Sequence, residues 1–230
     1  MSRSLFLRDS VVRKNLMALT GLFLCLFLVI HLAGNLQLLL PAEQAQVQYN
    51  HYSELLSHNI FIKIVSYALY ASIIAHALYA LILTLRAKQA RGPQGYAYDK
   101  RGQVTPWYVR NMGVLGVLLL AFIIIHMRDF WFQYKFTEMP LDAEGRKDLY
   151  TIVAVAYQQL WYVALYVGAM LVLGFHLLHG FHSAFQTLGL YHSKYNRWVK
   201  WAGYGYTFII TAGFTIIPIY MYFTQNQPLP

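Results

Sequence analysis

The chain has 230 residues, of which 58% are apolar and 12% are charged, and its net charge is +9. A soluble domain usually carries about 25% charged and 45–50% apolar residues, so both values are displaced toward a membrane protein. This composition disfavours a disordered chain, a secreted disulfide scaffold and a nucleic-acid-binding domain. Because Cys25 is the single cysteine, an internal disulfide and a multi-cysteine metal or iron–sulfur site are excluded.

Five stretches are long and apolar enough to cross a bilayer as helices, which takes about 20 residues each. In chain order they are residues 15–40, 60–85, 111–131, 151–181 and 204–223. The first is too long for a signal peptide and continues without a small-residue cleavage site. The last contains Pro218, which a membrane helix tolerates as a kink. We therefore expect an all-α fold, with residues 1–230 forming one five-helix membrane domain.

The charged residues predict an orientation for these helices. The N-terminal segment and the second and fourth connections together hold 13 basic residues against two acids. The first and third connections, the adjoining ends of the stretches and the C-terminal segment hold five basic residues against seven acids. Since basic residues stay on the cytoplasmic side, the N-terminus is expected inside and the C-terminus outside.

Six of the nine histidines lie within these stretches or at their edges, namely His31, His76, His126, His176, His179 and His182. Ionisable side chains inside a bilayer are rare and usually functional. At a rise of about 1.5 Å per residue, His31 and His126 lie roughly 25 Å from the cytoplasmic edge. His76 and His176 lie about 15 Å from it and His179 about 10 Å, so His76 can pair with His176 or His179. The spacing thus predicts an outer and an inner pair, each drawn from two helices.

Paired imidazoles on facing helices are typical of b-type haem with two axial histidines. The C-x-x-C-H signature of covalent c-type haem is absent, and a zinc site would need its ligands at one depth. A proton relay in a haem-free transporter or channel is an alternative. Such relays usually include carboxylates, and none lies in the middle of a stretch.

Several short motifs follow one another along the chain. They are SVVRKNLMALTG (10–21), HLAGNL (31–36), NHY (50–52), ARGPQGY (90–96), VRNM (109–112) and HLLHGFHSAFQTLG (176–189). Together with the histidine pattern, they resemble the cytochrome b membrane anchor of succinate:quinone oxidoreductases and fumarate reductases (respiratory complex II). The resemblance is to the single-chain, five-helix type with two haems, and it covers nearly the whole chain.

The resemblance implies that His31 and His126 hold the outer haem iron, and that His76 and His176 hold the inner one. Family members share a ligand His four residues before a Gly, which selects His176 with Gly180, while His179 stays the alternative. The basic cytoplasmic side suits haem propionates. The candidates for this contact are Arg13, Lys14, Arg110 and His182.

The implied function is electron transfer between an iron–sulfur subunit and membrane menaquinone. A flavoprotein subunit would carry the succinate or fumarate chemistry, and both partners would dock on the cytoplasmic face of a bacterial cytoplasmic membrane. Candidates for the quinone site are Glu54, with Glu43 second, and His51, Asn35 and Gln37. Gly174 stands where some diheme fumarate reductases carry a proton-transferring Glu. A bis-His cytochrome b of a hydrogenase or formate dehydrogenase is the alternative function.

Overall fold

The computed structural model describes residues 10–94 and 100–225, and within these ranges the chain consists of helices and connecting loops without a β-strand. Five helices are long and apolar enough to cross a membrane, which confirms the predicted all-α, five-helix architecture. Part of the charge count (Arg3, Arg8, Asp9 and Asp99) and part of the 90–96 motif lie outside the described residues.

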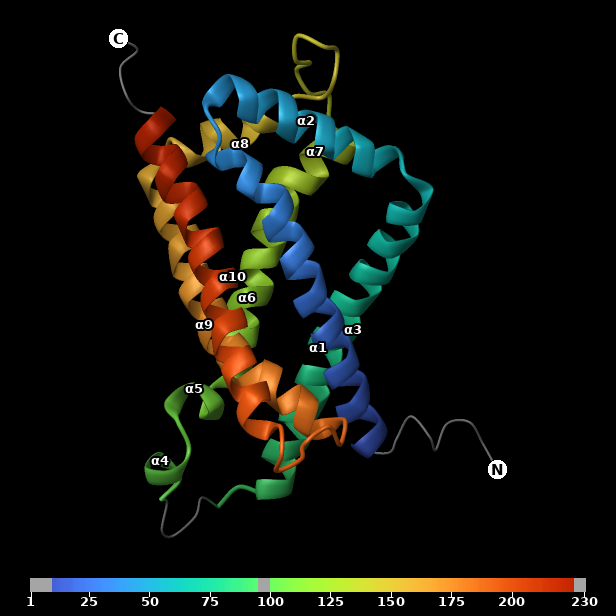
Figure 1. Ribbon diagram of the computed structural model, residues 1–230. Coiled ribbons are helices and arrows are strands. Elements are labelled where there is room, and N and C mark those ends of the chain that lie inside the picture. The colour runs from blue at the N-terminus through green and yellow to red at the C-terminus, as the bar shows by residue number, and fades with distance from the viewer. Residues whose placement is uncertain (1–9, 95–99, 226–230) are drawn as a thin grey trace.

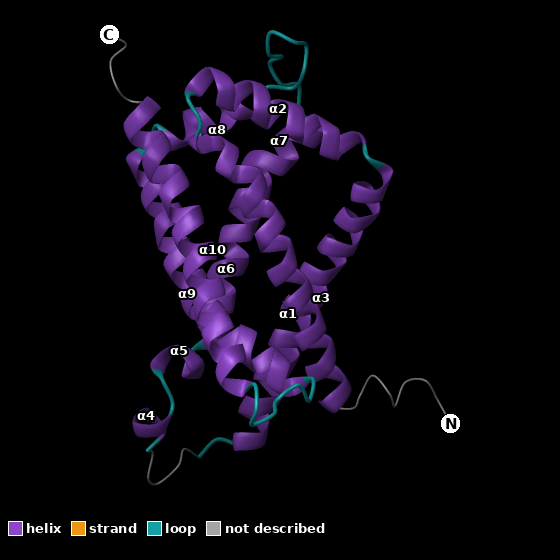
Figure 2. Ribbon diagram, in the orientation of Figure 1, coloured by secondary structure: helices purple, strands orange, loops and turns teal. Residues whose placement is uncertain are grey.

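Five helical runs cross the length of the molecule (Figures 1 and 2). They are α1 (Ser10–Asn35) with the 3-10 turn η2 (Leu36–Leu39), α3 (Ile60–Arg91), α6 (Met112–His126) with the π-helix η3 (Met127–Phe132) and α7 (Gln133–Phe136), α9 (Leu160–Thr187), and α10 (Asn196–Gln225). Four shorter helices lie at the two ends of the bundle. They are α2 (Ala42–His58), α4 (Arg101–Val104), α5 (Trp107–Arg110) and α8 (Leu149–Tyr157).

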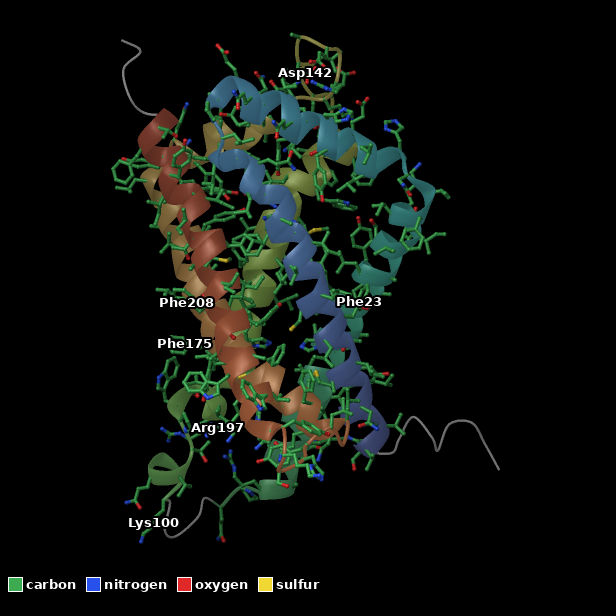
Figure 3. All side chains as sticks on the ribbon, viewed as in Figure 1. Phe23, Lys100, Asp142, Phe175, Arg197 and Phe208 are labelled. Atoms are coloured by element: carbon green, nitrogen blue, oxygen red, sulfur yellow. The ribbon has the colours of Figure 1, made fainter. Side chains whose placement is uncertain are left out.

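The two ends of the bundle differ in structure and in charge. Figure 1 shows α2 and α8 across one end, and α4 and α5 at the other. The start of α1 lies at the α4/α5 end and the end of α10 lies at the α2/α8 end, as an odd number of crossings requires. In Figure 3, Lys100 and Arg197 lie at the α4/α5 end, whereas Asp142 lies at the α2/α8 end.

The structure differs from the predicted stretches at two places. The first connection, which no predicted stretch covers, contains the helix α2, so His51 and His58 lie on a helix. The predicted fourth stretch is divided, because the chain leaves the helix at Gln158 and Gln159 and α9 begins only at Leu160. The part before the break is α8, which packs on α2 instead of continuing α9.

A buried polar group joins α2 to the connection before α8. The Asn50 side chain is fully buried, and its amide nitrogen donates to Asp148 Oδ1 (2.9 Å) and Asp142 Oδ2 (3.2 Å). Its carbonyl oxygen accepts from the Tyr150 backbone N–H (3.0 Å). Burial by itself would raise the pKa of Asp142 and Asp148, but the hydrogen bonds they accept outweigh it and lower both pKa values. This polar group holds α2 across the end of the bundle.

The apolar core lies toward the α2/α8 end, where α1, α2, α8, α9 and α10 meet. Glycine permits close helix contact there, because a Cβ on Gly34 would come within 2.6 Å of the Tyr52 ring and one on Gly213 within 2.7 Å of Leu32. Large apolar side chains also cover the outside of the bundle, and Tyr67 and Phe208 are each 72% exposed. Outward apolar side chains along membrane-length helices are what contact with lipid tails requires.

Candidate functional site

One histidine pair joins α3 to α9. The ring centroids of His76 and His176 are 6.3 Å apart, and the ring planes cross at 65°. His176 lies toward the C-terminal part of α9, so this pair lies nearer to the α4/α5 end of the bundle. The ring that lies against His76 is that of His176, and His179 follows one turn further along α9.

A second histidine pair joins α1 to α6, nearer to the α2/α8 end. The ring centroids of His31 and His126 are 5.7 Å apart and the planes cross at 83°. Aromatic rings surround this pair, with Phe27 stacked on His31 at 5.1 Å and Phe130 edge-on to His126 at 5.4 Å. Both pairings expected from depth along the helices therefore occur in the folded chain.

The ring separations can be compared with the size of a metal centre. A metal–imidazole nitrogen bond is about 2 Å long, and a ring nitrogen lies about 1 Å from its centroid, so two imidazoles on opposite sides of one ion have centroids about 6 Å apart. The observed separations of 5.7 Å and 6.3 Å fit this value. Residues 10–94 and 100–225 contain no group of three or more His, Cys, Asp or Glu side chains placed to hold a metal ion. Each pair can therefore supply two ligands, and the others would have to come from a cofactor.

The second nitrogen of each ring distinguishes the four histidines. Nδ1 of His76 lies 3.2 Å from Thr20 Oγ1 on α1, and Nδ1 of His126 lies 3.2 Å from the Tyr166 hydroxyl on α9. Nδ1 of His31 lies 3.4 Å from Asn35 Nδ2. His176 differs, because its Nδ1 is buried without a hydrogen-bond partner among the described residues. Of the four rings, His176 is therefore the one whose tautomer is not fixed by a hydrogen bond at Nδ1 among the described residues.

The propionate candidates lie at or near the α4/α5 end. Arg13 is buried on α1, about 10 Å along the helix from Thr20 at 1.5 Å per residue. Lys14 and Arg110 are exposed. The ring of His182 is engaged elsewhere, since its Nε2 lies 3.3 Å from Asn196 Oδ1 on α10.

The quinone candidates differ in their distance from the His31–His126 pair. Asn35 contacts His31 directly, and its amide nitrogen also donates to the His31 carbonyl oxygen (2.7 Å). Gln37 donates to the Gly34 carbonyl oxygen (3.1 Å) close by on the same segment. Glu54, His51 and Glu43 lie on α2, where His51 and Glu43 are exposed and Glu54 is partly exposed.

The structure adds residues that the sequence reasoning did not select. Tyr166 contacts Tyr162 through their hydroxyl oxygens (3.2 Å), and Tyr162 donates to Asp129 Oδ2 (2.8 Å). Asp129 lies in the π-helix that directly follows His126, and such helices occur often at functional sites. The i, i+4 spacing of the two tyrosines was visible in the sequence, but their contact with His126 depends on how α6 packs against α9.

No family model, curated protein or solved structure matches the chain.

Proposed function

We propose that this chain is the diheme cytochrome b anchor of a succinate dehydrogenase or fumarate reductase, passing electrons between an iron–sulfur subunit and membrane menaquinone. The observation that supports it most is that four histidines form two pairs. Their ring centroids are 5.7 Å and 6.3 Å apart, which suits one metal centre in each pair. The motif resemblance along the chain selects this complex over a hydrogenase or formate dehydrogenase, which is the second candidate.

In this proposal, four helices would each supply one histidine to a haem. His31 on α1 and His126 on α6 would hold one haem b, and His76 on α3 and His176 on α9 would hold the other. Haems held by two histidines would supply reversible one-electron transfer when bound. The two sites follow one another along the helices, which would carry electrons across the membrane.

Other residues of the chain would bind the propionates or the quinone, or keep water away from the histidines. Buried Arg13 and exposed Lys14 and Arg110 would pair with propionates, since charge-assisted hydrogen bonds to carboxylates are the strong ones. Phe27 and Phe130 keep water from the His31–His126 pair. Asn35, in contact with His31, is the quinone candidate nearest to a ligand. The basic α4/α5 end would receive the iron–sulfur and flavoprotein subunits.

A reduced-minus-oxidised spectrum of the purified complex tests the function. With succinate as the donor, we expect two b-type haems per chain to become reduced. A pyridine haemochrome assay without haem b would contradict every cytochrome function and favour a haem-free transporter. Reduction by hydrogen or formate, but not by succinate, would select the second candidate.

We also infer that the α4/α5 end faces the bacterial cytoplasm. In a Cys25→Ser background, Gln48→Cys on α2 and Gln103→Cys on α4 place single thiols at exposed positions of opposite ends. A membrane-impermeant maleimide should label Gln48→Cys in spheroplasts and Gln103→Cys only in inverted vesicles. The reverse pattern would contradict the inferred orientation.

A further inference from the structure

A chain of three hydrogen bonds connects an ion-paired carboxylate to the His126 ring. Asp129 Oδ1 is bound by the Arg128 guanidinium (2.6 Å), and Asp129 Oδ2 accepts from the Tyr162 hydroxyl (2.8 Å). The Tyr162 and Tyr166 oxygens are 3.2 Å apart, and the Tyr166 oxygen is 3.2 Å from His126 Nδ1. Arg128 and Asp129 lie in the π-helix and the two tyrosines on α9, so the contact between Tyr162 and Asp129 crosses between the two helices.

The donor and acceptor inventory leaves one order for the protons in this chain. An ionised carboxylate only accepts, and a tyrosine hydroxyl has a single hydrogen. Tyr162 therefore gives its hydrogen to Asp129 and must accept from Tyr166. Tyr166 has then used its own hydrogen, so its contact with His126 requires that Nδ1 carries the hydrogen and donates it.

We propose that Asp129, acting through Tyr162 and Tyr166, is a positioning residue that sets the Nδ1–H tautomer of His126 and leaves its Nε2 lone pair unprotonated. Neutral imidazole binds a metal through an unprotonated nitrogen, so this tautomer prepares Nε2 as the ligand atom. A carboxylate at the far end of the chain also makes the imidazole more electron-rich, because it stabilises partial transfer of the Nδ1 proton.

The same count of donors and acceptors gives the Nδ1–H tautomer for His76 in the other pair, but there the contact leads to an uncharged group. Thr20 has one hydroxyl hydrogen and donates it to the Leu16 carbonyl oxygen (2.8 Å), so Thr20 Oγ1 accepts from His76 Nδ1. The contact of His76 thus leads to a neutral backbone carbonyl, whereas that of His126 leads to a carboxylate. Breaking the Asp129 chain should therefore change one site and not the other.

The tautomer follows from the hydrogen bonds, whereas its effect on iron rests on the proposed function. The test is a redox titration of the whole complex carrying Tyr162→Phe, which removes the bridging oxygen and keeps the ring. We expect the midpoint potential of the outer haem to rise, because its ligand donates less electron density, while that of the inner haem stays unchanged. The component that disappears in His31→Ala identifies the outer haem.

Tyr157→Phe is the matched control. Tyr157 is a buried tyrosine whose ring lies 5.2 Å from that of Tyr166, but its hydroxyl is not part of the chain. Its removal should leave both potentials unchanged. Asp129→Asn keeps an acceptor oxygen and removes the charge, so it should raise the potential of the outer haem by less than Tyr162→Phe does. It replaces Tyr162→Phe in the test if that variant does not assemble. Unchanged potentials, or equal shifts of both haems, would overturn the proposal.

A second readout separates this proposal from the proposed function. In protein containing 15N-labelled histidine, the signals missing from His126→Gln report the tautomer of His126 directly. In haem-free protein, where no iron occupies Nε2, we expect Nδ1–H in the unmodified chain and Nε2–H in Tyr162→Phe, where Tyr166 becomes free to donate. If the complex contains no haem b but this change of tautomer occurs, the function is wrong and the positioning role stands. An Nε2–H tautomer in the unmodified protein overturns the positioning role.

Discussion

His76 on α3 and His176 on α9 lie with their ring centroids 6.3 Å apart, although two further histidines on α9 could have taken the place of His176. His179 follows one turn later, and the His182 ring contacts Asn196 and Tyr191 instead. The packing of α9 therefore selects one of three histidines that share a helix face.

Replacing the two alternative ligands should give different haem contents. His176→Ala removes the ring beside His76, so we expect the complex to lose one of two haems, as measured by pyridine haemochrome content per flavin. His179→Ala should keep both. Loss of a haem from His179→Ala, with both retained in His176→Ala, would reverse the assignment of the ligand.

Gly21 on α1 keeps space for the His76 ring. A Cβ on Gly21 would lie 3.2 Å from His76 Cε1, closer than ordinary contact, and the branched side chain of valine would press further on the imidazole. We expect Gly21→Val to lower the content or shift the potential of the inner haem and to leave the outer haem unchanged. Gly116→Val on α6 is the matched control, because nothing lies within 4 Å of its Cβ position. Equal effects of both variants would mean that helix propensity, rather than contact with His76, is responsible.

Asn50 should be important for the stability of the α2/α8 end. Asn50→Ala removes three buried hydrogen bonds, one from the Tyr150 N–H and two to the carboxylates of Asp142 and Asp148. Since a hydrogen bond contributes about 0.5–1.5 kcal/mol, and more when one partner is charged, we expect a loss of at least about 2 kcal/mol in the free energy of unfolding in detergent. Gln48→Ala, at an exposed position of the same helix, should change it by less than about 0.5 kcal/mol.

The same polar group predicts a dependence of stability on pH. The pKa values of Asp142 and Asp148 lie below the ordinary value of 3.8, because the hydrogen bonds that both carboxylates accept outweigh the effect of burial. A lowered carboxyl pKa stabilises the fold fully above the ordinary value, and this contribution is lost as the pH falls through the lower values of the folded state. Thermal unfolding midpoints should therefore be steady from neutral pH down to about pH 5 and fall steeply below about pH 4.

Asp148→Asn tests the origin of this acid-induced loss. The variant removes one of the two carboxyl groups, so the difference in midpoint between neutral and acid pH should become smaller than in the unmodified protein. Glu43→Gln, an exposed carboxyl on α2, should keep the full difference. An unchanged difference in Asp148→Asn would assign the acid sensitivity to other groups.

Local properties of the chain were sufficient for the architecture. Runs of about 20 apolar residues predict five membrane-length helices, since hydropathy and length decide whether a segment can cross a bilayer. Counting residues at 1.5 Å each placed His31 with His126, and His76 with His176 or His179, because helical rise is the same wherever the helix packs. Hydropathy and residue counting failed at the end of the bundle. They did not predict the polar helix α2, and they did not predict the break at Gln158 and Gln159 that separates α8 from α9.

The sequence by itself thus determined the number of helices, the charge difference between the two ends and the depth of each histidine. Only the tertiary structure decided which side chains meet at a given depth. His176 rather than His179 lies against His76, and Tyr166 supplies the hydroxyl beside His126 Nδ1, because the rotation of α9 about its axis depends on packing with α1, α6 and α10. Depth follows from position along one helix, whereas contact between helices follows from the shapes of all their surfaces together.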